Sequence, residues 1–287
     1  MTQQMASVDA LGAEDWAGEV GDRWLRNVDN FESMLAPVSV ALFQQANYMP
    51  GQRVIDVGCG GGATSVAIAR LVAPEGVVVG VDISPALTAE ATTRAQQHEL
   101  RNLSFIAADA ATLQWPEVPF DRLHSRFGSM FFANPAAAFR NLRSLLKPDG
   151  RADFAVWAPA KDSPWVANMM AIMRNHLDLP RPEPRAPGPF ALDDPDYFGG
   201  LLRQAGFDQL EFNLWRGEQA IGGAGSTATT AVDFVLDSMS IGDVAREQPQ
   251  LVRDRIHEDL LQMFRSHERP AGVMMTAIAW LVSARRS

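Results

Sequence analysis

A cluster of glycines directly after a short apolar segment is the strongest chemical signal in this sequence. Residues 54–62 read Val-Ile-Asp-Val-Gly-Cys-Gly-Gly-Gly, which places glycines at alternate positions 58, 60 and 62. Glycine lets a backbone turn tightly and approach a ligand closely, where any Cβ would obstruct the approach. Gly58, Gly60 and Ala63 also satisfy the dinucleotide fingerprint G-x-G-x-x-G/A. The cluster alone therefore leaves two classes of nucleotide cofactor open.

Acidic side chains stand at the ends of three successive predicted strands. Asp56 precedes the first glycine by two residues, where a carboxylate can meet a cationic ammonium group. Asp82 ends the next strand, where a carboxylate can accept both ribose hydroxyls, a feature shared with NAD enzymes. Asp109 ends the third strand, where it can accept from an adenine amine while the N–H of Ala110 donates to the ring. With Gly62, which extends the turn to G-x-G-x-G, these residues favour a nucleoside bearing an amino acid over a diphosphate.

Asp82 and Asp109 also have a plainer interpretation. Asp is a preferred N-cap of helices and a common residue of strand-end turns, so each carboxylate alone is compatible with a purely structural role. Both together, one strand apart, favour the ligand-binding interpretation.

Alternating apolar and helical segments are expected to position these residues. Five segments have the pattern of buried strands: 53–57, 76–83, 103–108, 120–125 and 152–157. Helical patterns lie between or beside them at 63–72, 85–100 and 135–146. Such alternation indicates a parallel sheet with helices on both faces. A helix at 195–205 and strands at 207–215 and 273–284 complete the prediction, an α/β fold with a Rossmann-like, seven-stranded, mostly parallel sheet.

Three further regions predict helical additions to this sheet, which we interpret as a lid. The N-terminal region predicts two helices broken at Pro37. The Gly/Ser/Thr-rich stretch 217–230 predicts a mobile loop, and 232–267 predicts helix. The expected organisation is a helical cap (1–50), a cofactor-binding core (51–157), an insertion (158–192), a core helix and strand (193–216), a helical lid insertion (217–271) and the last strand (272–287).

The chain resembles the class I S-adenosylmethionine-dependent methyltransferases, in particular the small-molecule subgroup related to the ubiquinone/menaquinone biosynthesis enzymes. The resemblance covers 51–157, resumes at 204–207 and the last strand, and rests on the blocks 50–62, 79–84, 108–110, 120–121, 125–128 and 145–150. It implies S-adenosylmethionine as cofactor and S-adenosylhomocysteine as product. It further implies Asp56, Gly58 and Gly60 around the methionine moiety, Asp82 on the ribose, Ile83 against adenine, Asp109 and Ala110 on the adenine edge, backbone groups of Ser125 at the methionine amine, and Trp24 above the cofactor.

Several departures from the motifs of other methyltransferases narrow the class of acceptor. Residues 124–127 read His-Ser-Arg-Phe where methyltransferases of nucleobases and protein glutamine carry an Asn-Pro-Pro-Tyr-like motif. Trp157, Ala158 and Pro159 stand where metal-dependent catechol methyltransferases place metal ligands, and one cysteine, Cys59, cannot serve an arsenite methyltransferase. The expected reaction is in-line methyl transfer, without a metal, to a small-molecule acceptor whose reacting atom (O, N or C) stays open.

Two histidines are candidates for a general base. His124 ends the fourth strand beside the expected methyl site, and His176 lies in the insertion. The competing interpretations are a structural strand histidine and a solvated helix-end histidine. A dry wall around the acceptor is expected from Phe127, Met130, Phe131, Phe132, Trp165, Met169, Met170 and Met173, about half of which we expect to be ordinary core residues.

Composition limits the partners and the compartment. The net charge of -9 argues against nucleic acid, because phosphate neutralisation needs clustered Lys and Arg. A single cysteine fits a reducing compartment. The N-terminus lacks a basic and apolar leader, and the apolar run 273–284 is shorter than the ~20 residues of a membrane span. We therefore expect a cytoplasmic enzyme, without a membrane or nucleic-acid partner, acting on a small and largely apolar or aromatic acceptor.

Other functions remain open at this point. A short-chain NAD(P)-dependent oxidoreductase needs a Tyr-x-x-x-Lys pair, and neither Tyr48 nor Tyr197 has Lys four residues later. A non-catalytic, methyltransferase-like binding protein is disfavoured by the intact carboxylates of the first three strands. A third alternative keeps the sulfonium cofactor and uses its charge to steer a cyclisation or a decarboxylation.

Overall fold

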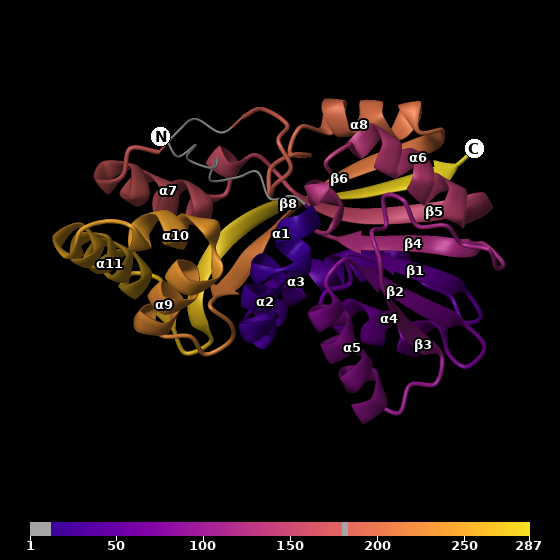
Figure 1. Cartoon of the computed structure of the whole chain (residues 1–287), viewed down its shortest axis with the longest axis horizontal. Coiled ribbons are helices and arrows are strands. Elements are labelled where there is room, and N and C mark those ends of the chain that lie inside the picture. Colours follow the sequence, from indigo (N-terminus) through magenta and orange to yellow (C-terminus); the bar gives the residue numbers. More distant parts are fainter. Residues whose placement is uncertain (1–12, 180–182) are drawn as a thin grey trace.

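The computed structural model describes residues 13–179 and 183–287, and it places one sheet at the centre of the molecule (Figure 1). The strand order is β3-β2-β1-β4-β5-β8-β6, with the short β7 paired to β8 off this path. Strands β1 to β5 run parallel, while β8 is antiparallel to both β5 and β6. The strands are β1 (Arg53–Val57), β2 (Val77–Asp82), β3 (Leu103–Ala107), β4 (Phe120–Arg126), β5 (Leu146–Trp157), β6 (Phe207–Ile221), β7 (Glu268–Arg269) and β8 (Gly272–Arg286). The predicted Rossmann-like, mostly parallel α/β sheet is confirmed.

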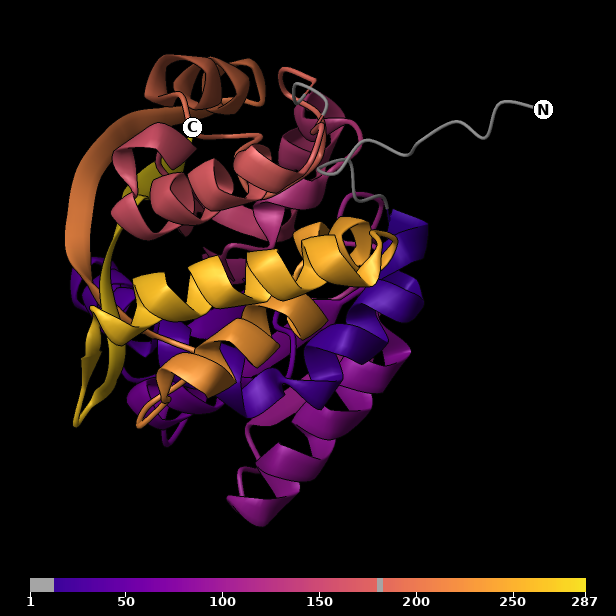
Figure 2. The same cartoon turned by 90° about the vertical axis from the view of Figure 1, so that its left-hand side faces the viewer.

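Helices cover both faces of the sheet. In Figure 1, α6 and α8 lie at the top, beside the β6 end of the sheet, and α5 lies near the bottom, beside the β3 end. Helices α7, α9, α10 and α11 gather around the far ends of β6 and β8, as Figure 2 shows from that side. The helices are α1 (Ala13–Ala17), α2 (Glu19–Arg26), α3 (Val28–Ala46), α4 (Ala63–Val72), α5 (Pro85–Gln97), α6 (Pro135–Leu145), α7 (Pro164–His176), α8 (Pro195–Gln204), α9 (Ala228–Ser238), α10 (Ser240–Arg246) and α11 (Gln250–Arg265), with 3-10 turns η1 (Ser129–Phe131) and η2 (Ala160–Asp162). Among the described helices, none has both the length and the apolar character needed to cross a membrane.

The starts of three helices are fixed by one local device. A polar residue caps the helix and proline occupies its first turn, where the missing N–H costs nothing. Ser84 Oγ accepts from Leu87 N at 3.3 Å at the start of α5. The side chains of Asn134 and Asp194 cap α6 and α8 in the same way. For α5, the cap directly follows β2, so the chain turns into the helix at the carboxyl edge of the sheet.

The predicted break at Pro37 is wrong, because α3 continues through this residue for 19 residues in all. The helical segments are instead separated at Gly18 and Asn27. Proline inside a helix removes one hydrogen bond and crowds the preceding turn. Here Leu35, Val38 and Leu42, all 3% exposed or less, bury the face of α3 that packs on the sheet. That burial outweighs the local preference for a break.

The Gly/Ser/Thr-rich stretch predicted as a loop is in part a strand. β6 extends to Ile221, and its last residues pair with Val273–Met275 of β8. Three glycines with positive φ, at positions 222, 223 and 225, then form the turn before α9, which Thr227 caps. The region expected as continuous helix divides into α9, α10 and α11. The end of β6 forms a strand because it pairs with β8, more than 50 residues away in the sequence. A local sequence pattern cannot indicate such a long-range pairing.

Helices from the predicted lid regions share the main hydrophobic core. Trp165 and Met173 of α7 and Phe234 of α9 are buried in the same cluster as the strands β1, β4 and β5. An ion pair of 2.6 Å between Arg23 of α2 and Asp243 of α10 joins the N-terminal helices to this group. The helical additions are therefore packed against the sheet as one body with it.

Candidate active site

The predicted site residues converge at one edge of the sheet. Asp56 lies in β1 and Asp82 ends β2, while Asp109 lies two residues past β3 and Ser125 lies near the end of β4. These four strands are parallel neighbours in the order β3-β2-β1-β4, so their carboxyl ends meet along one edge. In open α/β sheets this edge is where ligands bind.

The glycine turn has the backbone shape that the sequence predicts. Gly58, Gly60 and Gly62 have φ values of +68°, +52° and +82°, a region that side-chain-bearing residues rarely adopt. A Cβ on Gly58 would lie 2.6 Å from the Cα of Gly128. The glycine turn and the turn after β4 thus touch through backbone atoms, a contact that the spacing of the glycines did not reveal.

Asp82 holds the glycine turn in place. Its Oδ2 accepts from Gly60 N at 2.8 Å and its Oδ1 accepts from Ser84 N at 3.0 Å. Burial raises the pKa of Asp82, and the backbone N–H groups of Ser84 and Gly60 oppose that shift. A carboxylate has about four lone-pair sites, so two further hydrogen bonds can be accepted here. Asp82 therefore combines a structural contact with the capacity to receive two hydroxyl donors.

Asp56 is buried with one oxygen bonded and the other left open. Its Oδ2 accepts from Thr64 Oγ1 at 2.7 Å and from Ser65 Oγ at 2.6 Å. Its Oδ1 is buried and has no hydrogen-bond partner among the described residues. Burial raises the pKa of Asp56, and the hydroxyls of Ser65 and Thr64 oppose the shift. A buried oxygen without a donor is costly, so the geometry suits a donor supplied by a ligand.

Sequence reasoning missed the roles of Thr64 and Ser65. They are the first hydroxyl residues after the glycine cluster, at the start of α4. That position, eight and nine residues beyond Asp56, returns their side chains to the end of β1. A helix that begins beside the strand it follows is the signal that could have identified them.

Trp24 lies over the glycine turn. An ideal Cβ at Gly60 would lie 3.7 Å from Trp24 Nε1. The indole stacks on Phe31 at 3.6 Å with an interplanar angle of 6°, and Trp16 meets it edge-on at 5.7 Å. The close approach of Gly21 in α2 to Ser84 Oγ, 2.9 Å from an ideal Cβ, seats the helix on the loop after β2. The helix thus holds an aromatic ring beside the glycine turn, and contact of Trp24 with a cofactor stays a prediction.

The predicted adenine residues form a fixed turn after β3. Asp109 Oδ1 accepts from Ala111 N at 2.8 Å, and Ala110 is buried. Asn141 of α6 donates 3.0 Å hydrogen bonds to the carbonyls of Ala110 and Leu113, which anchors the turn. Ile83, just past β2, is half-buried. The contacts of Ile83, Asp109 and Ala110 with an adenine ring stay predictions.

The chain leaves β4 through a strained, aromatic turn. Phe127 has φ +63°, which is unusual for a non-glycine residue. Its ring stacks on Trp157, at the end of β5, with centroids 4.0 Å apart. Ser125 Oγ is buried and has no hydrogen-bond partner among the described residues. Of the predicted dry wall, five residues are buried, namely Phe127, Met130, Trp165, Met169 and Met173, and the remaining three are partly buried against the same core.

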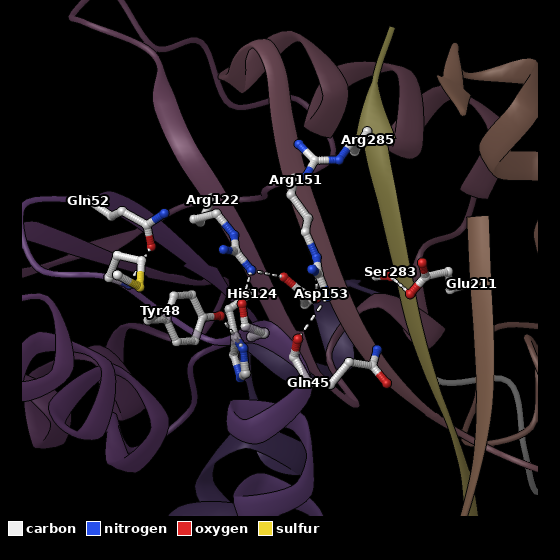
Figure 3. Close-up of polar contacts among 12 residues, drawn as sticks. Gln45, Tyr48, Gln52, Arg122, His124, Arg151, Asp153, Glu211, Ser283 and Arg285 are labelled. Carbon is white, nitrogen blue, oxygen red and sulfur yellow. Dashed lines mark hydrogen bonds and ion pairs between the residues drawn. The ribbon is translucent and has the colours of Figure 1, made fainter. Parts of the chain in front are cut away.

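His124 belongs to a polar network beneath α3, shown in Figure 3. It is fully buried, its Nδ1 lies 2.8 Å from the Tyr48 hydroxyl, and its Nε2 has no partner among the described residues. Burial lowers the pKa of His124 to about 3. Alongside it, Asp153 accepts from Arg122 at 2.7 Å and from Arg151 at 3.0 Å. This network ties the end of α3 to β4 and β5, and the catalytic role of His124 stays a prediction.

His176 joins two helices of the lid region. Its Nε2 lies 2.7 Å from Asp259 Oδ2, which connects the end of α7 to α11. The structure does not bring His176 into contact with the residues of the glycine turn in any described hydrogen bond or ion pair. Within residues 13–179 and 183–287, no group of three or more His, Cys, Asp or Glu side chains is placed to hold a metal ion.

The buried His124 gives the protein a testable pH dependence. In the unfolded chain His124 binds a proton below its ordinary pKa of 6.5, whereas in the folded chain it stays neutral down to about pH 3. The folded state therefore loses stability as pH falls through this window, by up to about 1.4 kcal/mol per pH unit from this residue. Urea unfolding at pH 6.5, 5.5 and 4.5 should show a shallower pH dependence for His124→Asn than for the wild type. Parallel curves would show that His124 does not titrate in this way.

Comparison with known proteins finds similarity to methyltransferases over part of the chain. Residues 49–173 match a family model described as a methyltransferase domain. Aklanonic acid methyltransferase DauC of Streptomyces sp. strain C5 is 32% identical over 118 residues, which cover 41% of this chain and 54% of DauC. The ubiquinone/menaquinone biosynthesis C-methyltransferase UbiE of Coxiella burnetii is 36% identical over 107 residues, 37% of this chain and 43% of UbiE. The chain spans about half the length of the curated relatives it matches.

A solved structure shows a likeness at the level of the fold. Phosphoethanolamine N-methyltransferase 2 of Haemonchus contortus, in complex with S-adenosyl-L-methionine, superposes with a TM-score of 0.54 at 14% identity, covering 95% of this chain and 61% of that chain. The resemblance to small-molecule methyltransferases read from the sequence is confirmed. Residues 49–173 thus match a methyltransferase-domain model, and the Rossmann-like fold resembles that of a methyltransferase solved with S-adenosyl-L-methionine.

Proposed function

We propose that this protein transfers a methyl group from S-adenosylmethionine to a small-molecule acceptor, with S-adenosylhomocysteine as product. The observation that carries the proposal is the convergence of Asp56, Asp82 and Trp24 on one glycine turn at the carboxyl edge of the sheet. An acidic pair beneath a turn of bare backbone, with an indole above it, suits a cationic nucleoside. It suits a diphosphate poorly, because two buried carboxylates would face its negative charge.

The residues of this edge fit the cofactor part by part. The unpartnered Oδ1 of Asp56 can accept from the methionine ammonium group, beside the backbone of Gly58, Gly60 and Ser125. The remaining lone pairs of Asp82 can accept the ribose hydroxyls. We assign the adenine to Ile83 and to the turn at Asp109 and Ala110, and Trp24 would cover the nucleoside. S-adenosylmethionine supplies a methyl group already activated by its sulfonium.

The protein would then promote methyl transfer by positioning the reactants and by excluding water. Holding reactants in a reactive geometry can lower a barrier by up to ~7–11 kcal/mol. The stacked rings of Phe127 and Trp157 and the buried Met130 offer a dry surface next to the glycine turn. We propose in-line displacement without a metal. A base role for His124 requires the acceptor to reach its Nε2, since its Nδ1 is bonded to Tyr48.

The relatives support a small acceptor. The names of DauC and UbiE describe methyltransferases of small biosynthetic molecules. The methionine-rich and aromatic surroundings of the β4 and β5 ends favour a largely apolar or aromatic acceptor. Whether oxygen, nitrogen or carbon is methylated depends on contacts in the helical additions, which the matched segment covers only in part.

A thermal-shift panel tests the cofactor class. A ligand that binds the native state stabilises it by RT ln(1 + [L]/Kd). We expect S-adenosylmethionine and S-adenosylhomocysteine to raise Tm, and NADH and NADPH at equal concentrations to leave it unchanged. A rise with the nicotinamides alone would overturn the proposed function.

A further inference from the structure

Gln219 is a buried polar side chain that the fold leaves unsatisfied. It lies in β6, is 0% exposed, and neither its amide oxygen nor its amide nitrogen has a hydrogen-bond partner among the described residues. The residues on the same face of the paired strands are Ile221, Val273 and Met275, all 2% exposed or less. The nearest same-face neighbours of this neutral amide in the two strands are therefore apolar.

Folding alone does not account for an amide at this position. Buried polar groups in native proteins are nearly always hydrogen-bonded, and leaving them unpaired is costly. Methionine has the same length and would pack in the same apolar layer without that cost. An amide that gains nothing from the fold is available to a ligand, because it offers two donors and one acceptor oxygen.

The sheet connects Gln219 to the expected methyl site. Trp157, whose ring stacks on Phe127, pairs with Ala279 of β8, and Gln219 pairs with Met275 of the same strand. Residues two apart in a strand share a face, so Gln219 and Trp157 lie on the same face of the sheet. Their partners in β8, Ala279 and Met275, are four residues apart, which corresponds to about 13 Å along the strand.

A second unpartnered donor lies on α7, the helix whose start is fixed to β8. Ser163 Oγ accepts from Ile278 N at 3.1 Å, which fixes the start of α7 against β8. Two residues later, Trp165 is 6% exposed, and its Nε1 has no hydrogen-bond partner among the described residues. Gln219 on β6 and Trp165 on α7 are thus two buried polar side chains that lack a partner among the described residues.

We propose that Gln219 recognises the methyl acceptor and that the acceptor is an uncharged, largely apolar molecule carrying a carbonyl and a hydroxyl group. This inference rests on the proposed function. A carbonyl receives a hydrogen bond from the amide N–H, and a hydroxyl donates to the amide oxygen. A charged group at this depth would lie against the buried apolar residues Ile221, Val273 and Met275, and burying a charge in such surroundings is strongly unfavourable. Trp165 Nε1 supplies one more donor to an acceptor oxygen.

Binding of two matched probes tests the proposal. The first is 6-hydroxy-2-acetonaphthone, a neutral hydroxy ketone whose hydroxyl lies too far from its own carbonyl to bond to it, and the second is 2-ethylnaphthalene, a hydrocarbon of similar shape. With the protein saturated with S-adenosylhomocysteine, calorimetry or tryptophan fluorescence should show at least about tenfold tighter binding of the hydroxy ketone by the wild type, a difference typical of hydrogen bonds to buried groups. The Gln219→Met variant should bind the two probes equally.

Stability and cofactor binding complete the test. Gln219→Met should leave the affinity for S-adenosylhomocysteine unchanged and should keep or raise Tm, because it removes an unsatisfied buried amide. The control Gln52→Met, at the opposite end of the sheet, removes an amide whose oxygen accepts from Met49 N at 2.9 Å and should retain the probe preference. A lower Tm for Gln219→Met, or equal binding of the two probes by the wild type, would overturn the inference. Failure of the wild type to bind S-adenosylhomocysteine would instead overturn the proposed function.

Discussion

The Asp82→Ala variant is expected to bind S-adenosylhomocysteine at least about 100-fold more weakly than the wild type. The proposed site assigns both ribose hydroxyls to this carboxylate, and hydrogen bonds to charged groups contribute about 1.5–3 kcal/mol each. Losing two of them corresponds to a factor of about 100 or more in Kd. The variant also releases Gly60 N, whose 2.8 Å bond to Asp82 Oδ2 holds the glycine turn. Titration calorimetry on the folded variant measures the effect.

Asp121→Ala is the matched control for Asp82→Ala. Asp121 accepts from Arg53 N at 2.8 Å and from Lys147 Nζ at 2.6 Å, at the opposite end of the sheet from the glycine turn. Its loss should lower stability and leave the Kd for S-adenosylhomocysteine within about twofold. Equal affinities of the wild type and Asp82→Ala would show that the ribose is bound elsewhere.

The Gly58→Ala variant should lose about 3 kcal/mol or more of unfolding free energy, or fail to fold. A left-handed φ alone costs a residue with a Cβ roughly 1–2 kcal/mol. At Gly58 the added Cβ would also lie 2.6 Å from the Cα of Gly128. Because this contact is with backbone, no side-chain rotation can relieve it. The clash would separate the glycine turn from the turn after β4, so cofactor binding should fall as well.

Gly51→Ala isolates the conformational part of that cost. Gly51 has φ +84°, and an added Cβ would meet nothing within 4 Å. Its replacement should therefore cost only the roughly 1–2 kcal/mol of the left-handed φ. Urea unfolding of both variants gives the comparison. Similar losses at the two positions would mean that the contact between Gly58 and Gly128 is unimportant.

Local patterns predicted the parallel half of the sheet well. The apolar runs at β1 to β4 and the capped starts of α5 and α6 are signals contained within a few residues, and the observed elements lie within three residues of the predicted ends there. Two predictions were wrong at places where contacts between residues far apart in the sequence determine the local structure. Burial of Leu35, Val38 and Leu42 keeps α3 continuous through Pro37, and pairing with β8 extends β6 through a Gly/Ser/Thr-rich stretch.

The residues of the candidate site could likewise be predicted only in part. Asp56, Asp82 and Asp109 could be found because parallel strands bring successive carboxyl ends to one edge, so spacing along the sequence reports position in space. The surroundings of His124 could not be found, because Tyr48 lies 76 residues away and reaches it only through the packing of α3. Gln219 could not be identified from the sequence either, because only the structure shows that its buried amide lacks a hydrogen-bond partner.

A crystal structure of the protein with S-adenosylhomocysteine tests the central claim most directly. We predict density for the nucleoside above the glycine turn, with the ribose hydroxyls on Asp82, the methionine ammonium at Asp56 Oδ1 and the Trp24 indole above. Density for a diphosphate cofactor at this edge, or S-adenosylhomocysteine bound anywhere else on the protein, would contradict the account.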